Sequence, residues 1–235
     1  MQIKVCGFND AQSISAVSSL DIEMIGMEFR ENVAKHISNI ITPAGTMIDK
    51  PFFRLVDKDD TAFYLGKSIE KIPGKKYVGV FADQSPQHLI SCAYNYNFDF
   101  LQLNGNETST YLKNFRSSVI PDILPEIKII KTLFIGNDNE LPDWHEYEGL
   151  ADMLNFEFTA PCAPGVDRLS AFNNYDGTIP FLISGIISPP EIMRTCRLSH
   201  PLFLGINIYY ESHHSFTPAD LGRIAFVIDK IRGRK

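Results

Sequence analysis

The sequence predicts a (β/α)8 TIM barrel, an α/β fold of eight parallel strands, each followed by a helix. Short apolar runs alternate with segments of helical spacing along 235 residues, a pattern typical of a parallel sheet with helices outside. Eight strand-like runs are present, and eight units in a chain of this length favour a closed barrel over an open sheet. We therefore predict a single barrel domain over residues 1–235.

The expected strands are short and rich in apolar residues. They are 3–6, 23–29, 77–82, 99–103, 128–133, 155–159, 180–184 and 203–208. The run at 77–82 reads Tyr-Val-Gly-Val-Phe-Ala and is almost continuously apolar. Such a run is typical of a parallel strand that is covered on both faces.

Capping residues mark several of the expected helices. Ser85-Pro86, Ser188-Pro189 and Thr217-Pro218 each place a hydroxyl N-cap before a proline at the first helical position. The expected helices are 10–18, 32–41, 85–94, one that begins at 109, 144–153, 168–174, 188–198 and 217–232.

Residues 43–75 interrupt this alternation of expected strands and helices. They contain two β-type runs, at 52–56 and 61–65, around the polar turn at 57–60. Two such runs around an Asp-rich turn predict a β-hairpin inserted after the second strand of the barrel.

Composition limits the classes of partner. The net charge is −6 and the basic residues are scattered, whereas nucleic-acid binding needs a clustered basic face, so we expect no nucleic-acid partner. The chain contains no run of 18 apolar residues, so we expect no membrane span. The four cysteines form no CxxC pair. We interpret them as reduced thiols in a cytoplasmic protein, with no disulfide frame, metal site or cofactor.

Cys6 ends the first expected strand, and active sites of barrels lie at the C-terminal ends of their strands. A cysteine there can act as a nucleophile or general base if its pKa is lowered, or it can be a small buried core residue. Thr159 ends the sixth expected strand and can hydrogen-bond a ligand or merely fill a strand position. Position alone leaves these alternatives open.

The loops after the seventh and eighth expected strands are candidate phosphate sites. In barrels these loops often hold a phosphate with backbone N–H groups, and Gly185 permits a close approach. Tyr209, Tyr210 and Glu211 follow the eighth strand. We expect two rings and a carboxylate there to crowd and repel a phosphate.

Side chains alternate along a strand, so Lys4 shares the face of Cys6, and Glu157 shares the face of Thr159. If these faces point inward, a lysine and a glutamate lie inside the barrel. An unpaired buried charge is very costly. We therefore predict a buried ion pair between Lys4 and Glu157.

Several motifs together resemble the phosphoribosylanthranilate isomerase family of tryptophan biosynthesis. The resemblance runs nearly end to end, is strongest in the first half, and is broken by the insertion after residue 42. The motifs are KVCG at 4–7, IGMEF at 25–29, VGVFADQSP at 78–86, FLQLNG at 100–105, IKTL at 130–133 and LISGI at 182–186. The resemblance implies a TIM barrel that catalyses an Amadori rearrangement of a phosphosugar, without metal or cofactor.

The resemblance also implies roles for particular residues. Cys6 matches the general base of the family, and Thr159 stands where we expect the aspartate that acts as general acid. Lys35 falls near the arginine that meets the anthranilate carboxylate, and Asn104 replaces a histidine. The remaining expected substrate contacts are Gln102, Gly185 and Tyr210.

The departures from the family pattern allow two interpretations. The chain is an isomerase with an altered acid position, or it is a divergent paralogue that has lost the activity and binds another small ligand or a protein. The resemblance gives no oligomeric state.

Overall fold

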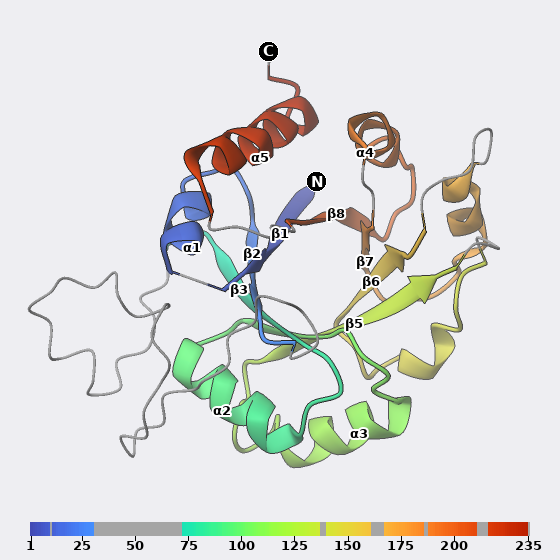
Figure 1. Ribbon diagram of the computed structural model, residues 1–235. Helices are drawn as coiled ribbons and strands as arrows, with labels where there is room; N and C mark the ends of the chain where they lie inside the picture. Colours follow the sequence, from blue (N-terminus) through green and yellow to red (C-terminus); the bar gives the residue numbers. More distant parts are fainter. Residues whose placement is uncertain are drawn as a thin grey trace, which may run out of the picture.

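Eight parallel strands close into a barrel in the order in which they occur along the chain (Figure 1). In this computed structural model, the strands are β1 Gln2–Phe8, β2 Met24–Glu28, β3 Lys76–Phe81, β4 Phe100–Leu103, β5 Lys128–Ile135, β6 Met153–Phe158, β7 Phe181–Ser184 and β8 Phe203–Tyr209. The barrel closes where Lys4 of β1 pairs in register with Asn207 of β8. The predicted TIM barrel is confirmed.

The structure describes residues 1–9, 11–30, 72–136, 140–160, 167–185, 188–210 and 216–234. The predicted helix at 32–41 and nearly all of the predicted insertion at 43–75 lie outside these ranges. Within them, no helix is both long and apolar enough to cross a membrane.

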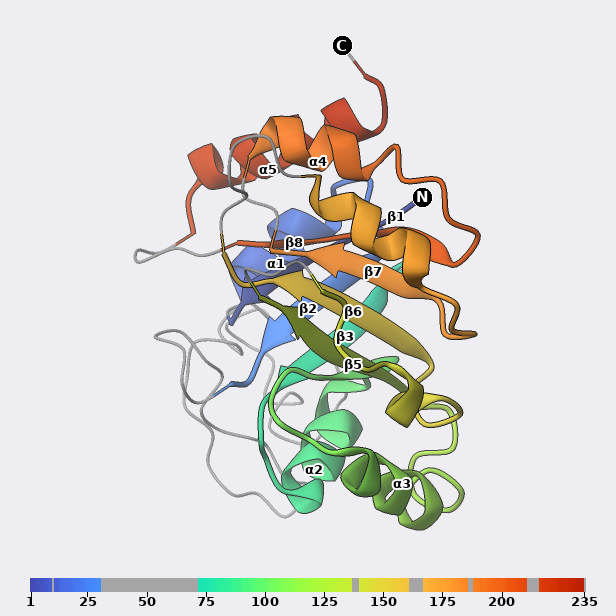
Figure 2. The same ribbon diagram turned by 90° about the vertical axis from the view of Figure 1, so that its right-hand side faces the viewer.

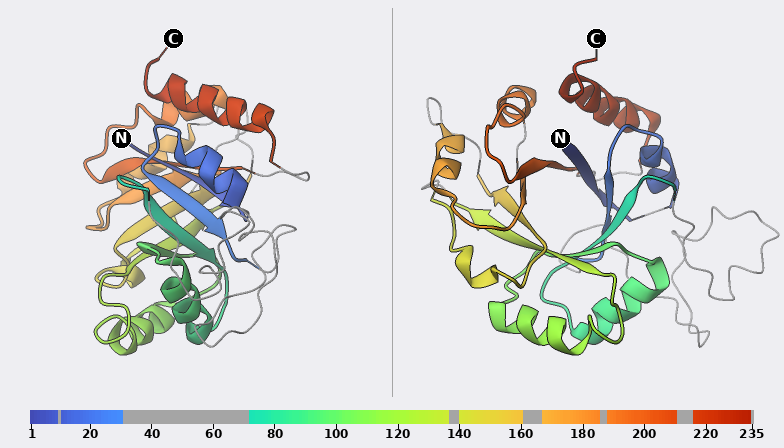
Figure 3. Two further views of the ribbon diagram at one scale, coloured as in Figure 1. Left: turned by 90° about the vertical axis from the view of Figure 1, so that its left-hand side faces the viewer. Right: turned by 180° about the vertical axis from the view of Figure 1, so that it is seen from behind.

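Helices surround the barrel on its outer side. They are α1 Ala11–Ser18, α2 Pro86–Tyr96, α3 Ser109–Ser118, α4 Pro189–Thr195 and α5 Pro218–Ile231. Two 3-10 segments, η2 His145–Tyr147 and η3 Arg168–Asn174, stand beside the later strands. Figure 2 shows α4 and α5 on one side of the strands and α2 and α3 on the other, and the view from behind in Figure 3 shows the same arrangement.

The predicted caps begin the helices as expected. The Ser85 side chain accepts a hydrogen bond from the His88 amide at the start of α2, and Ser188 does the same for Glu191 at α4. At α5, Thr217 forms a capping box with Asp220. These bonds satisfy amides that have no partner within the helix.

The helix predicted over 144–153 is wrong. Only the 3-10 turn His145–Tyr147 forms there. Gly149 adopts a φ of +71°, which ends the helical turn, and Met153 already belongs to β6. The apolar spacing of this segment therefore reflects packing of a loop and a strand, not one helical face.

Two apolar clusters fill the fold. The larger lies between the strands and the helices and includes Ile3, Val5, Met27 and Leu101. The smaller fills the barrel interior near the N-terminal ends of the strands. Its members are Met24, Val78, Phe100, Ile130, Met153 and Leu182. We call this smaller cluster the apolar floor of the barrel. The side chains between it and the C-terminal ends of the strands are the candidates for a functional site.

Candidate active site

Above the apolar floor, the barrel interior becomes polar toward the C-terminal ends of the strands. Strand alternation places the inward side chains two residues apart, and every strand except β3 adds one or two polar groups above the apolar floor. The buried ones are Lys4, Cys6, Glu28, Gln102, Asn104, Thr132, Asn155, Ser184 and Asn207. This edge of a TIM barrel is where active sites form.

Cys6 and Lys4 of β1 share one acceptor. The Cys6 thiol donates to Asn207 Oδ1 over 3.1 Å, and Lys4 Nζ donates to the same oxygen over 3.2 Å. Both residues are buried, Cys6 with 3% and Lys4 with 0% of its surface exposed. Burial raises the pKa of the Cys6 thiol, while the positive charge of Lys4 opposes this rise.

A chain of hydrogen bonds runs from Cys6 across the interior to Glu157. Asn207 Nδ2 donates to Asn155 Oδ1 over 3.4 Å, Asn155 Nδ2 donates to Ser184 Oγ over 2.9 Å, and the Ser184 hydroxyl donates to Glu157 Oε2 over 3.2 Å. β1, β8, β6 and β7 each contribute to this chain. The thiol and the carboxylate are therefore held in one connected network.

Glu157 is the last inward-facing residue of β6. Burial raises the pKa of its carboxyl group, and the Arg30 guanidinium, the Ser184 hydrogen bond and the Lys4 ammonium oppose the rise. A carboxyl group with a raised pKa keeps its proton to a higher pH, which is the property of a general acid.

Thr159 lies outside this network. β6 runs from Met153 to Phe158, so Thr159 follows the strand instead of ending it as the sequence predicted. Its side chain is exposed, and its hydroxyl donates to the Ile135 carbonyl over 3.1 Å. The carboxylate at the inner end of β6 is thus Glu157, two residues before the expected acid position.

Glu28 and Arg30, at the end of β2, form an ion pair that was not anticipated. Arg30 donates from Nε and Nη2 to the two carboxylate oxygens of Glu28, each over 2.7 Å, and the guanidinium lies 5.2 Å from the centre of the Tyr209 ring. Burial disfavours the charge of Arg30, but its hydrogen bonds to Glu28 and the negative charge of that carboxylate outweigh this effect, and the pKa of Arg30 is raised. The alternation of Met24, Gly26 and Glu28 along β2 was the signal that could have placed Glu28 inside.

The predicted direct pair between Lys4 and Glu157 does not form. Both side chains face the interior, as parity predicted, but Lys4 donates to Asn207 and Glu157 accepts from Ser184. Their charges still act on each other, since Glu157 opposes the lowering of the Lys4 pKa that burial causes. Neutral amides separate the two charges.

Gln102 and Asn104 border the same interior from β4. Gln102 Nε2 donates to Thr132 Oγ1 and to Asn104 Oδ1, each over 3.0 Å. The Thr132 hydroxyl also accepts from Asn155 over 3.3 Å. The two residues that the sequence singled out here are therefore joined to the network of Cys6 and Glu157.

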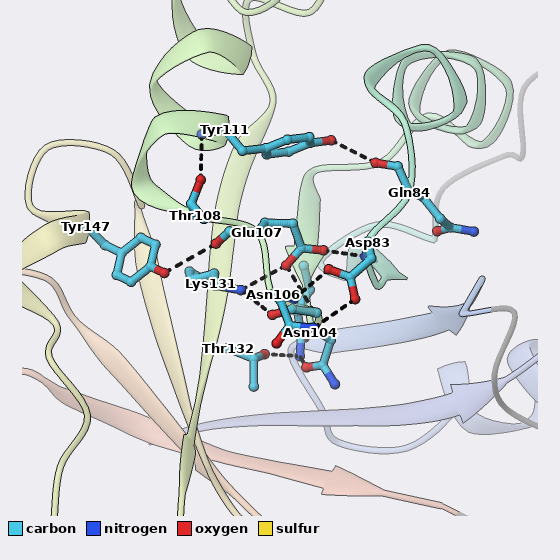
Figure 4. A network of polar contacts seen from close by, with 12 residues as sticks. Asp83, Gln84, Asn104, Asn106, Glu107, Thr108, Tyr111, Lys131, Thr132 and Tyr147 are labelled. Atoms are coloured by element: carbon cyan, nitrogen blue, oxygen red, sulfur yellow. Dashed lines mark hydrogen bonds and ion pairs between the residues drawn. The ribbon is translucent and has the colours of Figure 1, made fainter.

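A second polar network holds the loops after β3 and β4, as Figure 4 shows. Lys131 Nζ, on the outer face of β5, donates to Glu107 Oε2 over 2.8 Å, and Glu107 accepts from the Asp83 and Gly105 amides. Both partners are almost fully buried, Lys131 with 2% and Glu107 with 5% exposed. This network fixes the loop that carries Asn104.

Gly185 and Tyr210 occupy the expected phosphate region. Gly185 has a φ of +73°, and a Cβ there would lie 2.0 Å from the Phe158 carbonyl oxygen. The turn after β7 therefore requires glycine. The Tyr210 ring stacks on Phe8 with 5.9 Å between ring centres and meets Phe216 edge to face with 5.4 Å between ring centres, in the outer core. Tyr210 therefore does not crowd the mouth as expected, although Tyr209 does border it.

Several expected site residues lie outside the described ranges: Lys35, the loop at 161–166, residues 186 and 187, and residues 211–215 with Glu211. Within the described ranges, no group of three His, Cys, Asp or Glu side chains is arranged to hold a metal ion.

No family model matches the chain. A curated relative, N-(5'-phosphoribosyl)anthranilate isomerase of Parabacteroides distasonis, is 28% identical over 211 residues, which cover 88% of this chain and 83% of the relative. The crystal structure of phosphoribosyl anthranilate isomerase from Thermotoga maritima superposes with a TM-score of 0.65 at 16% identity and covers 99% of both chains. The chain is a divergent relative of the phosphoribosylanthranilate isomerases.

A further solved phosphoribosyl anthranilate isomerase, in complex with reduced 1-(o-carboxyphenylamino)-1-deoxyribulose 5-phosphate, superposes with a TM-score of 0.63 at 16% identity over 99% of both chains. These isomerases share the barrel with this chain over nearly its whole length.

Proposed function

We propose that this protein catalyses the Amadori rearrangement of N-(5-phosphoribosyl)anthranilate to the carboxyphenylamino-deoxyribulose phosphate, a step of tryptophan biosynthesis. The observation that carries this proposal is the connection of a buried thiol, Cys6, to a half-buried carboxyl group, Glu157, through Asn207, Asn155 and Ser184. The named isomerases among the relatives support the substrate class.

The rearrangement needs an acid and a base that act on neighbouring atoms of the sugar. The acid protonates the ring oxygen, so that the bond between this oxygen and C1′ breaks and the nitrogen lone pair forms a C1′ iminium. The base then takes the proton from C2′, and the electron pair of that C–H bond neutralises the iminium to give an enol-amine. This intermediate relaxes to the ketone.

Cys6 is the base in this scheme. Its thiolate would take the C2′ proton; Cys6 lies two residues before the end of β1, among the polar side chains of the barrel interior. Its hydrogen bond to Asn207 aims the sulfur along the interior. The raised pKa of the thiol leaves little thiolate at neutral pH, so catalysis depends on groups that stabilise the anion.

Glu157 takes the role of the acid in place of Thr159. Among the described residues, the carboxylates of Glu28 and Glu157 face the interior, but both oxygens of Glu28 are held by Arg30. Glu157 accepts only the Ser184 hydroxyl among its described contacts, and its raised pKa favours the protonated form. A threonine hydroxyl has no accessible proton near neutral pH, whereas a carboxyl group with a raised pKa keeps its proton to a higher pH.

The phosphate and the anthranilate carboxylate require their own contacts. The turn at Gly185 brings backbone close to the end of β6 and supports a phosphate site after β7. Lys35 remains the expected cation for the carboxylate, and Arg30 adds a positive charge at the described edge of the mouth. Gln102 and Asn104 would contact the sugar from β4.

Steady-state turnover of N-(5-phosphoribosyl)anthranilate by the purified protein tests this function. We expect measurable turnover that falls at least about 10²-fold in Cys6→Ala, as loss of a general base commonly costs. A Cys196→Ala variant serves as the matched control, because Cys196 lies at the end of α4, away from the interior. Absence of turnover in the unmodified protein would instead favour a paralogue that binds another ligand.

A further inference from the structure

Lys4 is a buried basic residue to which the proposed acid–base scheme assigns no role. None of its surface is exposed, and its ammonium donates to Asn207 Oδ1 over 3.2 Å. Taking an ammonium group out of water is costly, so a fully buried lysine needs a compensating anion or a functional reason. The neutral amide of Asn207 alone does not compensate the charge.

The charged and titratable groups around Cys6 come from four strands. Lys4 lies on β1, Glu28 and Arg30 at β2, Glu157 on β6 and Tyr209 on β8. Arg30 occupies both oxygens of Glu28.

The second carboxylate, Glu157, forms no ion pair with Lys4 and is linked to it through the neutral side chains of Asn207, Asn155 and Ser184. Among the described residues, Lys4 makes no ion pair.

The anion nearest to Lys4 is therefore the one that Cys6 would form on losing its proton. The Cys6 sulfur lies 3.1 Å from the same Asn207 oxygen that accepts from Lys4. Gly26 on the neighbouring strand keeps the space between them open, because a Cβ there would lie 2.4 Å from Cys6 Cβ and 3.1 Å from Lys4 Nζ. Lys4, Cys6 and Gly26 form one packed unit at the inner wall.

We propose that Lys4 is a positioning residue for the Cys6 thiolate, supplying the counter-charge that holds the negative charge on sulfur. A thiolate with a protonated Glu157 has the same net charge as a thiol with an ionised Glu157. Only the first form can start the proposed rearrangement. Lys4 shares an acceptor with the sulfur but is separated from the carboxylate, so it favours the active form. The effect of Lys4 on catalysis rests on the proposed function, whereas its stabilisation of the Cys6 thiolate does not.

Titration of the Cys6 thiolate tests this role without substrate. The absorbance difference at 240 nm between each protein and its Cys6→Ser counterpart follows the thiolate as the pH rises. We expect the midpoint to move upward by about one pH unit or more in Lys4→Met, as for loss of a cation near an ionisable group. Lys4→Gln, which keeps a hydrogen-bond donor for Asn207 but no charge, should show the same shift.

Lys75→Met is the matched control, because Lys75 donates to the Leu20 and Ile22 carbonyls before β2 and β3 begin, at the opposite end of the barrel. Its midpoint should stay at that of the unmodified protein. If Lys4→Met does not fold, Lys4→Gln decides. An unchanged or lowered midpoint in the folded Lys4 variant would overturn the proposal, even if the protein turns over the isomerase substrate. If turnover is absent but the midpoint rises, the charge role stands and the proposed function fails.

Discussion

Replacement of Glu157 by glutamine tests the acid role most sharply. Glutamine has nearly the same size and its amide oxygen can still accept from Ser184, so the packing of the interior should persist. What disappears is the proton that would reach the ring oxygen. Loss of a general acid commonly lowers the rate by about 10²–10⁴-fold, which corresponds to about 3–5 kcal/mol of activation free energy. We expect kcat to fall by this factor in Glu157→Gln.

The assay is steady-state turnover of N-(5-phosphoribosyl)anthranilate, with Thr159→Val as the matched control. Thr159 is exposed and its hydroxyl contacts only the Ile135 carbonyl in the described structure, so the control should keep its kcat within about threefold. A Glu157→Gln variant with unimpaired kcat, or a Thr159→Val variant with the large loss, would refute the assignment of the acid.

The same substitution has a second consequence for stability. The pKa of Glu157 is raised in the folded protein, so the folded state holds this proton more tightly than the unfolded chain. The stability that the protonated carboxyl group contributes is full below the unfolded pKa and is lost as the pH rises through the folded pKa. Glu157→Gln should therefore gain thermal stability over the unmodified protein as the pH rises above the ordinary glutamate pKa of about 4.3. A gain in thermal stability that shrinks as the pH rises would contradict a raised pKa of Glu157 in the folded protein.

Other substitutions test the framework around the site. Gly26→Ala places a Cβ 2.4 Å from Cys6 Cβ, so we expect it to lower the free energy of unfolding in urea by about 1–3 kcal/mol. Gly222→Ala, where nothing lies within 4 Å of the added methyl group, should instead raise it by up to about 1 kcal/mol, and equal effects would argue against the crowding. Lys131→Met leaves Glu107 as a buried charge without its cation and should lower the free energy of unfolding by about 3–5 kcal/mol, whereas an unchanged urea midpoint would show that this pair is not buried in solution.

The fold followed from local patterns that the structure preserves. Apolar runs such as that of β3 became strands buried on both faces, and hydroxyl–proline pairs such as Ser85-Pro86 became helix starts. Both patterns span only a few residues, so strands and helix starts can be predicted from them without knowledge of the tertiary contacts. The segment at 144–153 failed because Gly149 and the early start of β6 override its helical spacing.

The site was predicted less completely, because it depends on which residue ends each strand. An error of one or two residues at the end of β6 turned attention to Thr159 and away from Glu157, although parity had already placed Glu157 on the inner face. The direction of the Tyr210 ring depends on its contact with Phe8, which is distant in sequence and could not be paired with it from pattern alone. The Glu28–Arg30 pair was missed for a different reason: alternation along β2 could have placed Glu28 inside, but the sequence pattern does not identify Arg30 as its partner.

The pH dependence of kcat/KM tests the central claim, that Cys6 and Glu157 work as a base and an acid. One group must be deprotonated and the other protonated, so the account predicts a bell-shaped profile. Because burial raises the pKa of both groups, its rising limb should lie above the ordinary glutamate pKa of about 4.3 and its falling limb above the ordinary cysteine pKa of about 8.5. Glu157→Gln should lose the falling limb and keep a low rate that rises to a plateau. An unmodified protein without a bell, or a Glu157→Gln variant that keeps both limbs, would contradict the account.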